Sequence, residues 1–122
     1  GDHRDLHSFP TRRSSDLVVW FDFPQLCDGP RSAFDYVEIA KLYHAVLLAD
    51  VPQFDADKDD QARRFVSLVD ELYDRRVKLI IAAEVSIQAL YTGNNLVFAF
   101  QRIRSRLVEM QSHDYLGSEH LG

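Results

Sequence analysis

The fold of this chain is constrained most by three short apolar stretches. They are separated by segments in which apolar residues recur with the period of a helix. The stretches lie near residues 18–23, 45–49 and 77–83 and are rich in branched or aromatic side chains, as strands are. The segments near 32–43 and 60–75 repeat apolar residues every three to four positions, and a third such segment covers about 99–112. Strands joined by helices of this length pair in parallel with right-handed crossovers. The sequence therefore predicts an α/β fold, a partial three-layer parallel sheet.

Helix boundaries follow from capping residues and apolar stripes. Ser32 with Asp35 resembles a capping box, and Asp60 is the expected cap of the second helix. The three strands are apolar throughout, which is typical of sheets covered on both faces. Three helices cover such a sheet only in part, so we expect an exposed sheet edge where the missing part of the protein packs.

The first seventeen residues have no hydrophobic period of either kind. The segment 1–17 resembles, residue by residue, the conceptual translation of a short-read sequencing adapter. We therefore expect it to be non-native and disordered, and set it aside as a fusion scar is set aside. On this interpretation residues 18–122 are genuine sequence, and an N-terminal portion is missing before Val18.

Composition excludes several classes of protein. The formal net charge of the 122 residues is −5, which supplies no basic field for nucleic acid. No apolar run approaches the roughly 18 residues that a membrane helix needs. The single Cys27 has no partner for a disulfide within the chain and no second cysteine for zinc. These features indicate a reduced, cytoplasmic protein.

Acidic residues follow two of the predicted strands. Asp22 and Asp50 fall near the carboxyl ends of neighbouring strands, where ligands of parallel sheets usually bind. A phosphoacceptor receiver domain places acids in this way and is one alternative. However, its lysine should follow a strand end, whereas Lys78 lies near the start of its strand. The acidic run at 55–60 resembles a calcium loop but lacks its glycine and its final glutamate, so we expect no metal.

Nucleotide-binding motifs are incomplete in this sequence. No G-x-x-x-x-G-K-[ST] motif is present, so no loop can hold phosphates as a P-loop does. The segment 46–91 has the outline of a Walker B strand, a helix and a sensor strand. Its acidic end has Val51 after Asp50, where a catalytic glutamate would stand. We therefore expect the chain alone to be inactive and to need no cofactor.

The last predicted helix has a polar face with two arginines. Arg102, Arg106 and Glu109 lie on this face, and the arginines are like charges at i,i+4. One interpretation is a solvated face with an Arg106–Glu109 pair. The other is that both arginines contact a phosphate or a neighbouring acidic surface.

Long motifs carry a resemblance to a known family. The stretches 21–52, 61–85 and 98–116 resemble the C-terminal part of ZapE-type ATPases and their mitochondrial relatives, which are AAA+-like (AFG-like) P-loop proteins. The most specific motifs are Arg63-Arg64-Phe65, the run 70–74 (DELYD) and the run 105–112 (SRLVEMQS). The likeness extends from Val18 to about Leu121. Ser86 departs from the family pattern, which has proline there.

This resemblance implies a parent enzyme that hydrolyses ATP with magnesium. It also implies a partner at the bacterial division site, the tubulin-like ring protein, and for mitochondrial relatives a link to protein quality control. Neither the Walker A motif nor the catalytic Walker B motif of the family falls on any residue here. By analogy, the candidates for nucleotide sensing or for an interface are Arg63, Arg64, Arg102, Arg106 and Glu109. The alternative is a non-catalytic module that binds a partner or a neighbouring subunit through the face with Arg102 and Arg106. On the ATPase interpretation, the missing N-terminal ATPase half is itself a partner of this chain.

Overall fold

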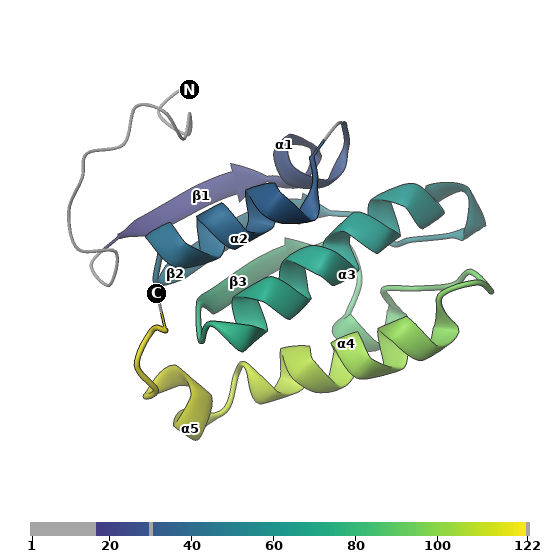
Figure 1. Ribbon diagram of the computed structural model, residues 1–122. Helices are drawn as coiled ribbons and strands as arrows, with labels where there is room; N and C mark the ends of the chain where they lie inside the picture. Colours follow the sequence, from purple (N-terminus) through teal and green to yellow (C-terminus); the bar gives the residue numbers. More distant parts are fainter. Residues whose placement is uncertain (1–16, 30, 122) are drawn as a thin grey trace.

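Three parallel strands form the sheet of this chain. The computed structural model describes residues 17–29 and 31–121. Strands β1 (Val18–Asp22), β2 (Ala45–Val51) and β3 (Lys78–Ala83) lie in the order β1-β2-β3, and both neighbouring pairs are parallel (Figure 1). The α/β prediction is confirmed, and each strand lies within two residues of its expected range. All but the last residue of the adapter-like segment 1–17 lies outside the described residues, so that interpretation stays a prediction.

The helices follow the predicted order, with two additions. Three of them match the expected segments: α2 (Ala33–Leu42), α3 (Asp59–Asp74) and α4 (Val97–Glu109). The last begins two residues earlier and ends three residues earlier than its predicted range 99–112. The additions are the short helices α1 (Phe23–Cys27) and α5 (His113–Leu116), together with two single 3₁₀ turns, η4 (Ala56–Lys58) and η5 (Ile87–Ala89).

Local side-chain contacts explain where α2 and α3 begin. Asp35 Oδ2 accepts a hydrogen bond from the Ser32 backbone N–H at 2.9 Å, the contact that the capping-box prediction requires. The predicted cap of α3, Asp60, is wrong by two positions, because α3 begins at Asp59 directly after η4. The acidic run instead caps η4, where Asp55 accepts a hydrogen bond from the Asp57 N–H at 3.0 Å.

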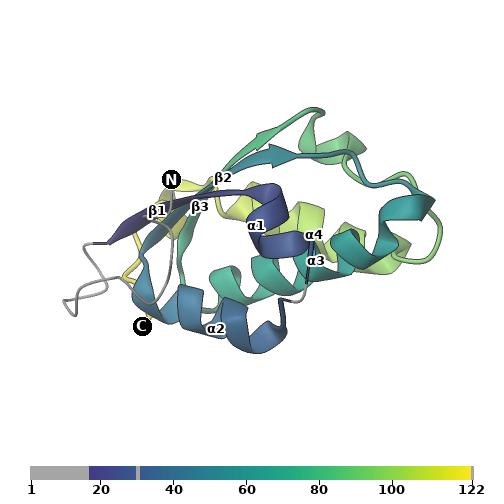
Figure 2. The ribbon, with the colours of Figure 1, turned by 90° about the horizontal axis from the view of Figure 1, so that it is seen from above.

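The core lies between the sheet and the helices. Figure 2 shows α1, α2, α3 and α4 on the same side of the three strands. Aromatic rings fill the space at the carboxyl end of this layer: Phe54 lies 5.3 Å from Phe65 and 5.7 Å from Phe100, between ring centroids. All three side chains are fully buried, and burying each contributes roughly 1.5–3 kcal/mol. Helices α3 and α4 are thereby anchored to the loop that follows β2.

The opposite side of the sheet carries no helix among the described residues. We call this surface the outer face and define it by the six side chains that alternate away from the helices: Val18, Trp20, Leu47, Ala49, Ile80 and Ala82. Trp20 is 54% exposed and Ile80 is 59% exposed, whereas Phe21 and Val46, which point to the helices, are at most 1% exposed. The expectation that three helices cover only part of the sheet is confirmed.

Candidate functional site

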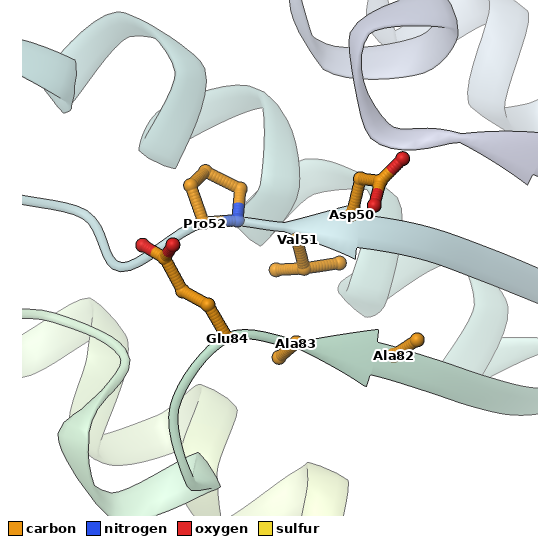
Figure 3. Close-up of a pocket in the computed structure, with 6 residues that line it drawn as sticks. All are labelled: Asp50, Val51, Pro52, Ala82, Ala83 and Glu84. Carbon is orange, nitrogen blue, oxygen red and sulfur yellow. The ribbon is translucent and has the colours of Figure 1, made fainter.

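All three strands end at the same edge of the sheet, where a cavity opens. The cavity has a volume of about 300 Å³ and is lined by Asp50, Val51, Pro52, Ala82, Ala83 and Glu84 (Figure 3). The lining combines two carboxylates with small or apolar side chains. This is the edge at which parallel sheets usually bind ligands.

Asp50 is held in an unusual backbone conformation at this edge. Its φ is +62°, in the left-handed region, and the pairing of β2 with β3 shifts between Leu48 and Val51. Aspartate is one of the few residues that adopt this region at modest cost. In Figure 3 the exposed Asp50 side chain points away from β3.

Glu84 has a structural role in the same cavity. Its Oε1 accepts a hydrogen bond from the Gln53 backbone N–H at 2.8 Å, and Gln53 Nε2 donates to the Ala89 carbonyl at 2.9 Å. These bonds hold the segment after β2 against the segment after β3. The sequence marks Glu84 only as a strand end, so its contact with Gln53 could not be predicted.

Asp22 ends β1 but does not line the cavity. Its backbone N–H donates to Gln25 Oε1 at 2.7 Å at the start of α1, and Pro24 occupies the first turn of that helix. Of the two strand-end acids, only Asp50 lines this cavity, although both lie at the carboxyl edge. Among residues 17–29 and 31–121, no group of three or more His, Cys, Asp or Glu residues is placed to hold a metal ion.

The arginines of α4 meet an aspartate of α3. Arg102 Nη2 lies 2.9 Å from Asp70 Oδ2, and Arg106 Nη1 lies 2.5 Å from Asp70 Oδ1. The side chains of Asp70 and Arg106 are each 28% exposed, and that of Arg102 is 44% exposed. One carboxylate thus neutralises the i,i+4 repulsion between two arginines and joins the two helices.

Tyr73 completes this cluster. The Arg106 guanidinium lies 4.5 Å from the Tyr73 ring centroid, a cation–π distance. The Tyr73 hydroxyl donates to Glu109 Oε1 at 2.7 Å, and this hydrogen bond is the main reason why the pKa of Tyr73 is raised. The expected Arg106–Glu109 pair is corrected: Arg106 pairs with Asp70 and Glu109 with Tyr73. The sequence did not predict Asp70 as the partner of these arginines, because it lies 32 and 36 positions away from them. Its place in the DELYD motif was the only sign that it matters.

Arg63 and Arg64 point to different surroundings. Arg63 pairs with Asp60 at 3.6 Å, with side chains 56% and 86% exposed. Arg64 Nη1 donates to the Cys27 carbonyl at 3.3 Å and so joins α3 to α1. The five residues proposed for sensing or for an interface are therefore divided among three places, with only Arg102, Arg106 and Glu109 together.

Comparison with known proteins places this arrangement in a family. The model of the AFG1-like ATPase family matches residues 2–119. The chain belongs to the AFG1-like ATPase family. The matched region begins inside the segment 1–17, and the adapter interpretation of that segment remains a prediction. No solved structure matches this chain.

Several relatives are similar along most of this chain but are much longer. The cell division protein ZapE of Escherichia coli (strain K12) is 50% identical over 120 residues, which are 98% of this chain and 31% of that protein. An uncharacterized protein of Schizosaccharomyces pombe is 32% identical, over 87% of this chain and 30% of its own length. Lactation elevated protein 1 homolog B of Danio rerio is 31% identical, over 84% of this chain and 27% of its own. The chain spans less than a third of each relative.

Proposed function

We propose that this chain is the C-terminal part of an AAA+-like ATPase that acts in cell division in the bacterial cytoplasm. The observation that carries the proposal is the 50% identity to a cell division protein over 98% of this chain but only 31% of that relative. The remaining two thirds of the parent protein supply the Walker A and catalytic Walker B motifs and bind ATP with magnesium. Its partner at the division site is the tubulin-like ring protein.

The geometry supports a non-catalytic role for this part. Asp70 already pairs with both Arg102 and Arg106, which weakens their attraction for a phosphate. The cavity at the carboxyl edge is lined by Asp50 and Glu84, whose negative charges repel the polyphosphate of a nucleotide. Among the described residues, no helix is both long and apolar enough to cross a membrane.

A nucleotide-binding measurement tests the proposal. Titration of a fluorescent ATP analogue with magnesium into this chain should show no saturable binding up to millimolar concentration. The full-length gene product, measured in the same buffer, should bind and hydrolyse ATP. Saturable binding by the 122-residue chain, or no hydrolysis by the full-length product, contradicts the proposal.

A second candidate function is a protein-interaction module without any ATPase activity in the parent protein. The exposed Trp20 and Ile80 of the outer face favour it, because exposed apolar patches mark surfaces that bind other proteins. The hydrolysis assay on the full-length product separates the two candidates. Activity supports the ATPase, and its absence supports the module.

A further inference from the structure

The outer face is an apolar surface without a charged residue at its centre. A shallow cavity of about 210 Å³ lies on it, and its lining contains no charged side chain: Trp20, Leu47, Leu48, Ala49, Ile80, Ile81 and Ala82. These residues come from all three strands, so the surface is continuous across the sheet. Such a patch is larger than the single exposed apolar residues that are normal on proteins.

Strand β3 shows how incomplete the packing is. Its last five residues (Leu-Ile-Ile-Ala-Ala) are all apolar, yet every residue of β3 is half-buried or exposed. Strands of parallel sheets that are apolar on both sides are normally buried on both faces. An apolar edge strand of this kind promotes aggregation unless another element covers it. The composition of β3 is therefore that of a strand covered on both faces, and the second covering layer is not among the described residues.

The length of the relatives indicates what supplies that layer. This chain corresponds to 31% of the cell division protein ZapE and to 27–30% of the two other relatives described above. The remaining two thirds of such a protein are more than long enough to add helices to a three-stranded sheet. Because α/β sheets are covered by helices on both faces, an apolar helix layer is the expected occupant.

A second copy of this chain fits the outer face less well. Helices α2, α3 and α4 already pack their apolar sides on the inner face, where Ile39, Leu68 and Ile103 are fully buried. Their exposed sides are mostly polar, although Phe34 on α2 and Val97, Phe98 and Val108 on α4 are exposed. A second copy would therefore offer mainly its own sheet face, and stacked parallel sheets are not how α/β folds bury their strands.

We propose that, in the full-length protein, helices from the part of the polypeptide outside this chain cover the outer face and complete the three-layer fold. The carboxyl end of this face is bordered by Asp22, Asp50 and Glu84, so the covering helices carry basic side chains at that end. The proposal rests on the proposed function only in taking the chain as part of a longer protein. It does not depend on ATP binding.

Thiol accessibility tests this proposal directly. Ala82 is exposed on the outer face, and Ser105 is exposed on α4, on the other side of the molecule. The variants Ala82→Cys and Ser105→Cys are made in this chain and in the full-length product, with other exposed cysteines of the latter replaced. Cys27 is fully buried and reacts only on unfolding, so it does not interfere. The rate of maleimide labelling is measured at submicromolar protein.

The expected result is a difference between the two variants. Ala82→Cys should label rapidly in this chain and at least about tenfold more slowly in the full-length product. Ser105→Cys should label equally fast in both. Equal labelling of Ala82→Cys in both proteins overturns the proposal. Slower labelling of Ala82→Cys in this chain as its concentration rises, without slower labelling in the full-length monomer, also overturns the proposal. That result would indicate that a second copy covers the outer face.

A pair of lysine substitutions provides a second readout. Ile80→Lys places a charge on the outer face, and Phe98→Lys places one at an 83% exposed position of α4. Ile80→Lys should lower the melting temperature of the full-length product by several degrees and leave that of this chain unchanged. Phe98→Lys should change neither. Equal changes in melting temperature of the two proteins on Ile80→Lys contradict the proposal. ATP binding by the full-length product is measured separately, because it tests the proposed function alone.

Discussion

At the scale of single residues, Asp70 of α3 forms ion pairs with two arginines of α4. It receives hydrogen bonds from Arg102 and from Arg106, two positions that repel each other when unpaired. All three groups are partly exposed, which reduces the free energy of each ion pair through solvent screening. Asp70 therefore stabilises the packing of α4 on α3 by a modest amount.

The substitution Asp70→Asn should lower the free energy of unfolding by about 1 kcal/mol, because it removes the charge that two arginines share. Urea denaturation of this chain at low ionic strength measures the change. The matched control is Asp60→Asn, whose pair with Arg63 is 3.6 Å long and largely exposed, and it should leave stability unchanged. Equal losses in the two variants contradict the assigned role of Asp70.

The sequence located the arginines but not their partner. The i,i+4 spacing of Arg102 and Arg106 placed both on one helix face, which the structure confirms. Sequence spacing carries no information on which residue of another helix faces them. Asp70 and Tyr73 meet this face only because α3 and α4 pack side by side, and that packing depends on long-range contacts such as Phe65 with Phe100.

At the scale of elements, the predictable helices are those with a long apolar stripe. The period of α3 predicts one apolar stripe: Ala62, Phe65, Val66, Val69, Leu72 and Tyr73. Four of these residues are fully buried, whereas Val66 and Tyr73 are only partly buried. Helix α1 was not predicted, because Phe23 was assigned to the strand near 18–23, whereas it begins a helix that has Pro24 in its first turn. Helix α5 has only four residues, too few for a periodic pattern, and its position depends on tertiary contacts.

Tyr115 provides those contacts for α5. Its hydroxyl donates to the Val77 carbonyl at 2.7 Å and lies 3.2 Å from the Leu72 carbonyl, and the residue is 3% exposed. The ring stacks on Tyr73 at 5.9 Å between centroids. A single side chain thus ties α5 to the connection between α3 and β3.

The substitution Tyr115→Phe should lower the free energy of unfolding by about 1–2 kcal/mol, because it leaves the buried Val77 carbonyl without its hydroxyl donor while the ring still packs. Amide hydrogen exchange should also become faster in α5 and around Val77, with little change in α2. A matched control is Tyr73→Phe, whose hydroxyl bonds to the exposed Glu109 and should matter less. Unchanged exchange in α5 contradicts this role for Tyr115.

At the scale of the whole molecule, one helix layer on one side of the sheet buries several groups that ionise only in alkali. Burial raises the pKa of the Cys27 thiol to about 12, above its ordinary value of about 9. Burial likewise raises the pKa of the Tyr36, Tyr43 and Tyr115 hydroxyls above their ordinary value. The folded state therefore keeps protons that the unfolded chain releases as the pH rises.

The sign of the effect follows from proton linkage. A group whose pKa is raised by folding contributes its full stability below its unfolded pKa and loses it as the pH rises through the folded value. For Cys27 the loss begins near pH 9 and continues towards pH 12. By pH 10.5 the thiol alone should lower the free energy of unfolding by on the order of 2 kcal/mol, at about 1.4 kcal/mol per pH unit.

Urea denaturation of this chain should accordingly give a constant midpoint from pH 7 to about pH 8.5 and a falling one above about pH 9. The variant Cys27→Ala separates the thiol from the three tyrosines. It lowers stability at pH 7 through the lost buried atom, but its midpoint should fall less steeply between pH 9 and 10.5 than that of the parent chain. Parallel pH profiles for the two proteins would show that the thiol ionises alike in the folded and unfolded states. That result requires an accessible thiol in the folded molecule and contradicts the complete burial of Cys27 at the end of α1.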